Sequence, residues 1–429
     1  MDLIITRAKT LQGKLRSPSD KSLTHRAYMF GAIAEGSSRI LNPLVSQDCE
    51  NTLECLAKMG LRHESVSADE ILLHPAKEWN EPKDELYCGN SGTTIRLMSG
   101  LVASRPITAI LSGDASLSKR PMKRIASPLR EMGAEFIGDT PPLTIKGSAH
   151  LKGIDYVSPV ASAQIKTCTL FAGLRAEGPT TIHEPSLSRD HTERMLKALG
   201  MDVTISSEER GSVSRLNAGG TFKGFDFNVP GDISSSAFWL VAASIVLGAN
   251  LTLQGVGINP TRSGVLDVLT QAGVTYTLDS LRDELNEPVA DITVSNPSRL
   301  LPFEIKGSLV PRLIDEIPVL AVLASQCNGE TNIRDAGEMR IKESDRIELV
   351  AKGLRAMGAE VHVLEDGLTI IGPSELKGAV IETEGDHRIA MAFTIAGLIA
   401  EGETVIKDAQ NIATSYPDFE SHLALVRVG

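Results

Sequence analysis

Charged and small polar residues gather at the starts of several helices that the sequence predicts. Ser22 and Arg26 lie four residues apart after Asp20, a candidate N-cap. Lys342 and Arg346 repeat this spacing later in the chain, so both cations would project from one helix face and could clamp one phosphate. Because cations in a first turn oppose the helix dipole, their presence indicates a bound anion that compensates them. Solvent-exposed helix starts are the alternative interpretation.

A glycine-rich turn and a basic run extend this pattern. Residues 89–94, GNSGTT, offer backbone N–H groups to a carboxylate or phosphate, although the spacing is not that of a Walker loop. Residues 119–124, KRPMKR, hold four cations, for which a surface basic run is the alternative. Two further helix starts carry Asp315-Glu316 and Asp386-His387-Arg388.

These segments, together with residues 162–164, occupy corresponding places just before or within the first turn of an apolar helix. If the helices of each domain run parallel, their positive ends converge on one surface. Two such surfaces facing each other would form a cleft that collects anions. Six independent N-caps with scattered cations are the alternative, which does not explain why Arg and Lys concentrate there.

The elements that must hold these residues repeat six times. Small turns recur at nearly equal intervals, at residues 35–36, 104–105, 177–178, 247–248, 328–329 and 401–402. Each repeat is predicted to contain a strand, a helix, a strand, a helix and two further strands, which predicts an α/β fold. Six units exceed one core, so we expect two domains of three repeats each. A solenoid of six stacked units is the alternative.

Two Pro- or Gly-containing breaks, at residues 15–19 and 227–231, lie three units apart. They predict a discontinuous domain made of residues 1–18 and 230–429, with an inserted domain at 19–229. The active site is expected in the cleft between the two.

Composition excludes several classes of protein. The 429 residues are 42% hydrophobic, 23% charged and only 4% aromatic, as in large α/β enzymes. A net charge of −11 disfavours nucleic acid and anionic membranes as partners. The apolar runs are too short to span a bilayer, and residues 1–9 do not form a secretory signal, so a cytoplasmic protein is expected. Five cysteines without a C-x-x-C pair, and nine histidines without ligand spacing, predict neither a disulfide framework nor a metal site.

Eight segments together resemble the 5-enolpyruvylshikimate-3-phosphate synthase family, in order and over nearly the whole chain. They are DKSLTHR (20–26), GNSGTTIR (89–96), KRPMKR (119–124), SAQIK (162–166), SRDHTE (188–193), PGDISSSAFWL (230–240), RIKESDRI (340–347) and DHRIAMAF (386–393). The resemblance implies two inside-out α/β domains, each of three βαβαββ repeats with pseudo-threefold symmetry, joined by a double crossover.

The resemblance also implies a reaction. The enolpyruvyl group of phosphoenolpyruvate moves to the 5-hydroxyl of shikimate 3-phosphate by addition and elimination, and phosphate is released on the way to chorismate and the aromatic amino acids. No metal or organic cofactor is implied, and a monomer is expected. Both substrates are anions, which agrees with the cations at the helix starts.

The family's site residues carry over by motif. Shikimate 3-phosphate is assigned to Lys21, Ser22, Arg26, Ser162, Ala163, Gln164, Arg189, Asp315 and Lys342. Phosphoenolpyruvate is assigned to Lys21, Gly92, Arg120, Gln164, Arg346 and Arg388. Asp315 resembles the base at the 5-hydroxyl, Glu343 the group that handles the methylene proton, and Lys21 a lysine that touches both substrates. Asn90 and His387 are further candidates.

Glyphosate, a phosphonate, occupies the phosphoenolpyruvate site in this family. Gly92 has no Cβ and leaves room for it, which favours sensitivity. Leu97 stands where sensitive members often have Pro and argues against it. Two other departures are Ala163, in place of a second serine, and residues 414–418, TSYPD, which lack a lysine that some members carry.

Two rival functions stay open from sequence. UDP-N-acetylglucosamine enolpyruvyl transferase shares the fold and donor, but its flexible loop typically carries a cysteine that residues 113–118 lack. A two-lobed protein that closes on an anion without chemistry would need the cations but not Asp315 and Glu343.

Overall fold

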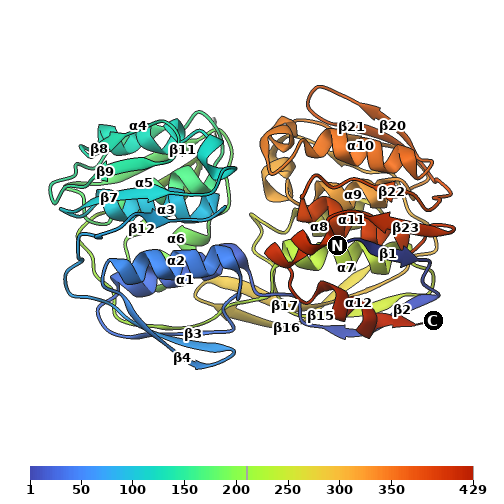
Figure 1. Ribbon diagram of the computed structural model, residues 1–429, viewed down its shortest axis with the longest axis horizontal. Coiled ribbons are helices and arrows are strands. Elements are labelled where there is room, and N and C mark those ends of the chain that lie inside the picture. The colour runs from blue at the N-terminus through green and yellow to red at the C-terminus, as the bar shows by residue number, and fades with distance from the viewer. Residues whose placement is uncertain (209–210, 429) are drawn as a thin grey trace. The chain divides into compact units, whose positions relative to one another are not determined.

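The structure is a computed structural model that describes residues 1–208 and 211–428. The chain forms two compact units, not one stack of six repeats (Figure 1). The terminal unit comprises Met1–Pro18, Pro230–Arg282 and Pro288–Gly429, and the inserted unit comprises Ser19–Val229 and Asp283–Glu287. Residues 283–287, expected in the discontinuous domain, thus belong to the inserted unit.

Within the described residues, the inserted unit holds three four-stranded sheets of the same design. In spatial order their strands are β14 (Asp226–Asn228), β3 (Ser38–Leu41), β5 (Glu70–His74) and β4 (Arg62–Ser67); β6 (Leu86–Tyr87), β7 (Thr108–Ser112), β9 (Leu143–Lys146) and β8 (Glu135–Ile137); and β10 (Asp155–Val157), β11 (Thr180–Glu184), β13 (Gly211–Leu216) and β12 (Val203–Glu208). The accompanying helices are α1 (Lys21–Ile33), α2 (Gln47–Lys58), α3 (Gly92–Ala103), α4 (Lys123–Glu131), α5 (Ala163–Gly173) and α6 (His191–Ala198), with a 3₁₀ turn η1 (Leu117–Lys119).

The terminal unit repeats this design, but its three sheets have five, four and three strands. Its sheets are β16 (Tyr276–Glu284), β17 (Glu287–Ser295), β15 (Asn250–Gly257), β2 (Thr10–Leu15) and β24 (Arg427–Val428); β18 (Glu304–Ile305), β19 (Gly329–Ile333), β21 (Leu368–Gly372) and β20 (Glu360–Val363); and β1 (Leu3–Thr6), β23 (Glu403–Ile406) and β22 (Val380–Ile381). Its helices are α7 (Ile233–Ile245), α8 (Gly264–Gln271), α9 (Ile317–Ala324), α10 (Arg346–Ala356), α11 (His387–Gly397) and α12 (Phe419–Val426), with 3₁₀ turns η2 (Gly307–Arg312), η3 (Gly337–Ile341) and η4 (Ala409–Thr414). The sixth repeat departs from the expected pattern, because β1 completes its sheet and β24 joins β2.

Strand pairing shows why the chain passes between the units. In each four-stranded sheet the first two strands are parallel, as β6 and β7 are, and the other pairs are antiparallel. The parallel partner of β3 is β14, which comes from the far end of the inserted segment, with Phe227 opposite Ile40. The parallel partner of β15 is β2, with Leu15 opposite Leu253. The first repeat of each unit is therefore closed by a strand that is distant in sequence.

The apolar helices of each unit form its core, and the sheets lie outside them. Most residues of α1, α3 and α5 are buried, and α7, α9 and α11 lie together in the same way in the terminal unit (Figure 1). Gly100 shows how close these helices come, because a Cβ at this position would overlap the Cys168 carbonyl of α5. The predicted α/β architecture of inside-out repeats is confirmed.

The tip of the β16–β17 hairpin packs into the inserted unit. Leu285 is partly buried and packs against the apolar core of that unit. The Arg194 guanidinium of α6 donates to the Asn286 carbonyl at 3.0 Å, and the Asn286 amide donates to the Arg194 carbonyl at 3.2 Å. The Glu287 carboxylate lies 2.9 Å from Nδ1 of His191, and both side chains are buried. The chain therefore crosses between the units four times, where a double crossover is expected.

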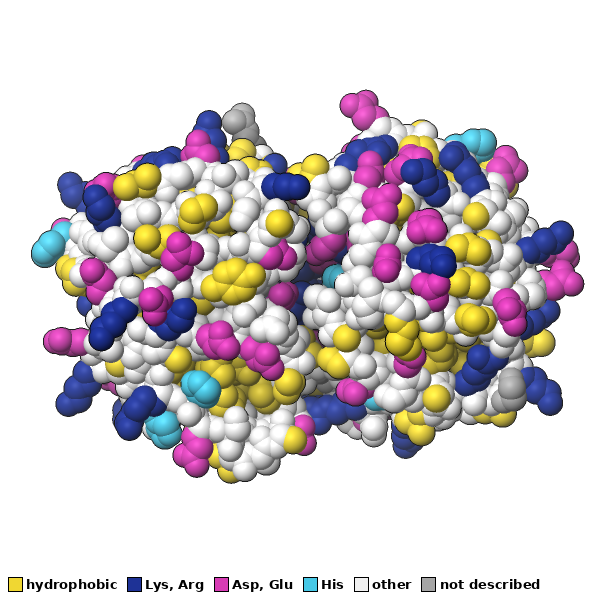
Figure 2. All heavy atoms as spheres, viewed as in Figure 1, with side chains coloured by type: hydrophobic (Ala, Val, Ile, Leu, Met, Phe, Trp, Pro, Cys, Tyr) yellow, Lys and Arg dark blue, Asp and Glu magenta, His cyan; other side chains and the backbone are white. Residues whose placement is uncertain are grey.

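The face shown in Figure 2 intersperses Lys and Arg with Asp and Glu. In the part of the chain that the structure describes, no helix combines the length and apolar character required to span a membrane.

Candidate active site

The helices α1, α3 and α5 of the inserted unit are linked near their first turns. Arg26 of α1 donates to the Thr167 hydroxyl of α5 at 2.9 Å. The Gln164 amide of α5 donates to Thr93 of α3 at 3.2 Å and accepts from Arg96 of α3 at 2.7 Å. The three N-termini, which carry the positive ends of the helix dipoles, therefore lie together.

Lys21 opens α1, because Asp20 caps this helix by accepting from the Leu23 amide at 2.9 Å. The Lys21 ammonium lies 2.9 Å from the Asp48 carboxylate of α2, and its side chain is 25% exposed. A cation in the first turn of α1 is thus balanced by a carboxylate from a neighbouring helix. An anionic substrate would have to compete with Asp48 for this charge.

Arg26 lies beneath the surface, with 3% of its area exposed. Its guanidinium donates to Thr192 at 2.8 Å, to the Ser22 carbonyl at 3.0 Å and to Thr167. Burial lowers the pKa of Arg26 to about 10, and the nearby positive charge of Arg189 acts in the same direction. Arg26 therefore stays protonated at neutral pH and links α1 to α5 and α6. Ser22 and Arg189 are half-buried.

Two guanidinium groups flank Gly92, the first residue of α3. A Cβ built at this glycine would lie 2.8 Å from Nη1 of Arg96 and 3.2 Å from Nη1 of Arg120. The Arg120 guanidinium donates to the Asn90 carbonyl oxygen at 2.7 Å, and the Asn90 amide donates to Asp114 at 2.7 Å. The glycine thus keeps open a space beside two cations, and Asn90 orients one of them.

The start of α5 presents Ser162, Ala163 and Gln164. Ser162 caps the helix, and its own amide donates to the Glu184 carboxylate at 2.9 Å. Ala163 is the first helical residue. Arg189 lies in the loop before α6. The predicted residues of the inserted unit therefore sit on the starts of α1, α3 and α5 and on the loops beside them.

In the terminal unit, three carboxylates surround Arg346, whose side chain is 1% exposed. Its guanidinium lies 2.8 Å from Asp386, 2.6 Å from Glu343 and 3.4 Å from Asp315. Ser344 donates to the same Asp386 carboxylate at 2.9 Å. These residues come from three helix starts, because Asp386 is the N-cap of α11, Arg346 begins α10, and Asp315 precedes α9. A planar guanidinium accommodates this set because it presents several N–H groups in fixed directions.

Two further cations reach Asp315. The Lys342 ammonium lies 3.5 Å from its carboxylate, and the Arg388 guanidinium donates to its backbone carbonyl at 3.2 Å. The expectation that Lys342 and Arg346 project from one helix is wrong, since α10 begins at Arg346 and Lys342 follows η3. Both cations nevertheless meet at Asp315, because the turn between them folds Lys342 back.

These charges fix protonation states. Burial alone would raise the pKa of Glu343, but Arg346, His387 and Lys342 hold it well below its usual range. Arg346 likewise overcomes the effect of burial and lowers the pKa of Asp386. Glu343 and Asp386 are therefore carboxylates at neutral pH. His387, the first residue of α11, is buried next to this cluster.

Four charged residues near the predicted site residues are not among the site residues that the sequence predicts. Arg96 follows Gly92 by four residues, so the helical spacing applied to Ser22 and Arg26 could have found it. Lys166 is a charge within an apolar helix, four residues after Ser162, and was equally visible. Asp386 was predicted only as part of a helix start, because its partner Arg346 is distant in sequence. Asp48 was not predicted, because no local pattern indicates its pairing with Lys21.

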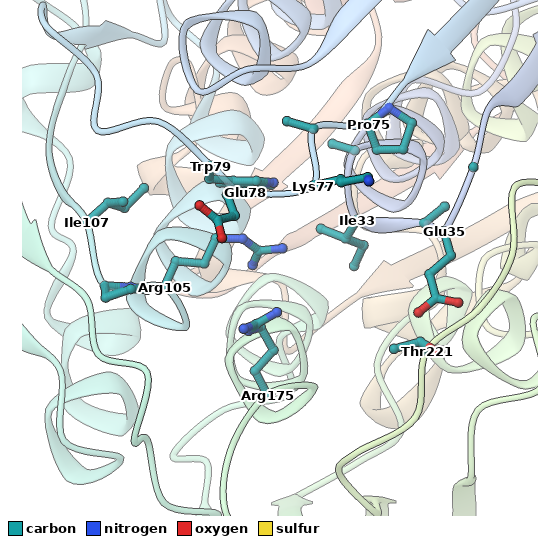
Figure 3. Close-up of a pocket in the computed structure, with 15 residues that line it drawn as sticks. Ile33, Glu35, Pro75, Lys77, Glu78, Trp79, Arg105, Ile107, Arg175 and Thr221 are labelled. Atoms are coloured by element: carbon teal, nitrogen blue, oxygen red, sulfur yellow. The ribbon is translucent and has the colours of Figure 1, made fainter.

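A pocket of 790 Å³ lies in the inserted unit at the opposite ends of the same helices (Figure 3). It is lined by Ile33 at the end of α1, Arg105 beyond α3 and Arg175 beyond α5. The Arg105 guanidinium carbon lies 3.8 Å from the centre of the Trp79 ring. Helix C-termini favour such cations without a ligand. None of the predicted site residues lines this pocket, so it is not the candidate active site.

Among the residues described, no group of His, Cys, Asp and Glu side chains is placed to hold a metal ion. The five cysteines are buried and free.

Comparison with known proteins gives one family. The family model of EPSP synthase (3-phosphoshikimate 1-carboxyvinyltransferase) matches residues 5–423. A 3-phosphoshikimate 1-carboxyvinyltransferase of Bacillus cereus is 47% identical over 419 residues, covering 96% of each chain. One from Desulforamulus reducens is 46% identical over 434 residues and covers all of both.

Solved structures agree. An EPSP synthase from Acinetobacter baumannii is 42% identical, with a TM-score of 0.90 over 99% of this chain and 98% of that one. The enolpyruvyl transferase NikO from Streptomyces tendae, 20% identical, shares the fold with a TM-score of 0.77 over 99% of this chain and 97% of that one. The chain therefore belongs to the EPSP synthase (3-phosphoshikimate 1-carboxyvinyltransferase) family.

Proposed function

We propose that the protein transfers the enolpyruvyl group of phosphoenolpyruvate to the 5-hydroxyl of shikimate 3-phosphate and releases phosphate. The observation that carries this proposal is the cluster around Arg346, in which Asp315 and Glu343 stand beside buried or half-buried cations. A protein that only binds anions would need the cations, but two carboxylates among them would weaken its binding. Carboxylates that can exchange protons in a cationic site favour chemistry.

Phosphate release tests the activity. The full-length protein should release phosphate from phosphoenolpyruvate when shikimate 3-phosphate is supplied and should not do so with UDP-N-acetylglucosamine. Release with the nucleotide sugar alone would assign the rival transferase activity. Binding of both anions without release would assign a non-catalytic binding protein.

In this proposal the inserted unit holds shikimate 3-phosphate. Lys21, Ser22, Arg26, Ser162, Ala163, Gln164 and Arg189 are its expected ligands there, and the three helix N-termini supply partial positive charge to the phosphate. Gly92, Arg120 and Gln164 meet phosphoenolpyruvate. Arg96 is added to this set, because its guanidinium contacts Gln164 and stands beside Gly92.

The terminal unit supplies the remaining groups. Arg346 and Arg388 bind phosphoenolpyruvate with planar forks that suit carboxylate and phosphate. Asp315 accepts the proton of the 5-hydroxyl while the hydroxyl oxygen attacks C2 of phosphoenolpyruvate. Before this transfer, Lys342 stabilises the carboxylate form of Asp315. The two sets of residues are expected to act on one pair of substrates, so neither unit should be competent alone.

Glu343 handles the methylene proton. In the unliganded protein it is a carboxylate held by Arg346, so it cannot donate. When an oxyanion of phosphoenolpyruvate binds the Arg346 guanidinium, Glu343 shares that positive charge with the substrate, and the pKa of Glu343 rises. Glu343 can then deliver a proton to C3 during addition and remove one during elimination, as the bond from C2 to the phosphate oxygen breaks.

Closure of the units is the first testable consequence. Small-angle scattering should show a smaller radius of gyration with shikimate 3-phosphate and glyphosate than without ligands, because binding energy draws the two sets of residues together. A radius that does not change would contradict closure on the substrates.

Metal independence is the second. We expect undiminished phosphate release after exhaustive chelation, because Lys and Arg supply the positive charge that a divalent ion would contribute. Loss of activity that only an added divalent ion restores would contradict this expectation.

Glyphosate inhibition is the third. The wild-type protein should be sensitive, because Gly92 leaves space beside Arg96 and Arg120. In Gly92→Ala, the new methyl would displace these guanidinium groups and should raise the glyphosate inhibition constant by a larger factor than the phosphoenolpyruvate KM. Both constants should be measured for both proteins. Equal changes, or a wild-type protein that glyphosate does not inhibit, would show that Gly92 does not determine the space available to glyphosate in the phosphoenolpyruvate site.

Solution properties extend the proposal. We expect a monomer, because both proposed half-sites lie on one chain. We also expect a cytoplasmic protein whose only partners are the two small anionic substrates.

A further inference from the structure

Lys166 is a buried charge within an apolar helix. It lies on α5, one turn after Ser162, and its side chain is 0% exposed. Its ammonium lies 2.8 Å from the Glu184 carboxylate and 2.9 Å from Glu193, whose side chains are each 1% exposed. It also donates to the Ser188 carbonyl at 3.3 Å. Lys166 thus forms ion pairs with two buried carboxylates and a hydrogen bond with one backbone carbonyl.

The partners of Lys166 lead to both edges of the proposed shikimate 3-phosphate half-site. Glu184 ends β11, and the oxygen that does not face Lys166 accepts from the Ser162 amide at 2.9 Å. Ser188 directly precedes Arg189. One ammonium therefore joins the backbone of Ser162, on one side, to the loop that carries Arg189, on the other.

The network has a third arm that leads away from the site. Glu193, on α6, accepts from the Ser214 hydroxyl of β13 at 2.9 Å. Burial disfavours the charged form of Lys166, but Glu193 and Glu184 raise its pKa above the ordinary value. The lysine is thus charged at neutral pH, and its removal would leave two buried carboxylates without their cation.

We propose that Lys166 is a positioning residue for shikimate 3-phosphate, which sets the separation between Ser162 and Arg189 without touching the substrate. This inference rests on the proposed function, because it assigns the two segments to one ligand. An apolar side chain would fill the same volume in the α5 core at less electrostatic cost. The charge is explained when the two segments must be held at a fixed spacing.

Lys166→Met tests this role, because methionine has a similar length and no charge. In the full-length variant we expect the dissociation constant of shikimate 3-phosphate, measured by calorimetry without phosphoenolpyruvate, to rise about tenfold or more. The KM of phosphoenolpyruvate, measured at saturating shikimate 3-phosphate, should change by less than about threefold. Lys166→Arg, which keeps the charge, should recover part of the affinity.

Two variants separate positioning from mere stability. Thr169→Val changes another buried polar residue of α5, which donates to the Ile165 carbonyl outside this network, and should leave shikimate 3-phosphate affinity unchanged. If Lys166→Met fails to fold, Lys166→Met with Glu193→Gln removes one of the uncompensated carboxylates. This double variant should recover the fold but not the affinity, because Glu184 and Ser188 stay unlinked.

The outcomes distinguish this inference from the proposed function. A wild-type protein that releases no phosphate with shikimate 3-phosphate overturns both. An active wild type, together with folded Lys166 variants that bind shikimate 3-phosphate normally, overturns only the positioning role. Equal losses for both substrates would also overturn it and would assign Lys166 a purely structural role.

Discussion

Replacing Asp315 with asparagine is expected to lower kcat by roughly 10²–10⁴, the usual span for loss of a general base. Asparagine keeps the size of the side chain and its capacity to accept a hydrogen bond from Arg346, but it cannot take the proton of the 5-hydroxyl. The KM of shikimate 3-phosphate should change far less than kcat. Steady-state phosphate release with each substrate varied in turn measures both quantities.

The matched control is Asp267→Asn, which removes another carboxylate of the terminal unit. Asp267 is 49% exposed and pairs with Arg312 at 2.6 Å, and it makes no ion pair with Arg346. We expect its turnover to equal that of the wild type. Near-normal turnover in Asp315→Asn would remove Asp315 from the mechanism.

Replacing Arg346 with methionine is expected to affect activity and stability together. The variant loses a guanidinium group that binds phosphoenolpyruvate. This loss should lower kcat by roughly 10²–10³, as for other groups that stabilise charge in a transition state. It also leaves Asp386 and Glu343 without their main cation, which should lower the free energy of unfolding by about 3–5 kcal/mol. Denaturant unfolding and phosphate release measure the two effects separately.

The stability loss in Arg346→Met should depend on pH. Because the folded protein holds the pKa values of Glu343 and Asp386 below their unfolded values, the cluster stabilises the wild type above about pH 4. That contribution disappears as the pH falls through the lower folded values, so the two proteins should converge in acid. Lys352→Met is the control and should show neither effect, because this α10 cation is 62% exposed and lies 3.9 Å from Glu348. An Arg346→Met protein of normal stability at neutral pH would contradict the proposed charge balance.

The repeats could be predicted because each leaves a local signal. Small turns after an apolar helix, and a capping residue such as Asp20 before one, depend on neighbours within a few residues. The pairing of β14 with β3 and of β2 with β15 leaves no such signal. Strands as short as Asp226–Asn228 carry little pattern, and only the closed sheet identifies their partners.

Among the candidate site residues, too, some could be predicted from the sequence and others could not. Cations at helix starts were visible from type and spacing, which led to Lys21, Arg346 and Arg388. Their counter-ions were not, because Asp386 meets Arg346 from 40 positions away and Asp48 meets Lys21 from 27. Sequence thus predicts where positive charge accumulates, whereas protonation states such as that of Glu343 depend on contacts between helices that only the fold brings together.

The hairpin tip at residues 283–287 has a consequence for how this chain can be divided between relatives. Leu285, Asn286 and Glu287 are encoded with the terminal unit, yet they complete the surface of α6 at His191 and Arg194. A chimaera that exchanges residues 19–229 alone would pair one parent's α6 with the other parent's tip. Recombination should therefore succeed only when both segments come from the same parent, so they form one inherited unit in spite of their separation in the gene.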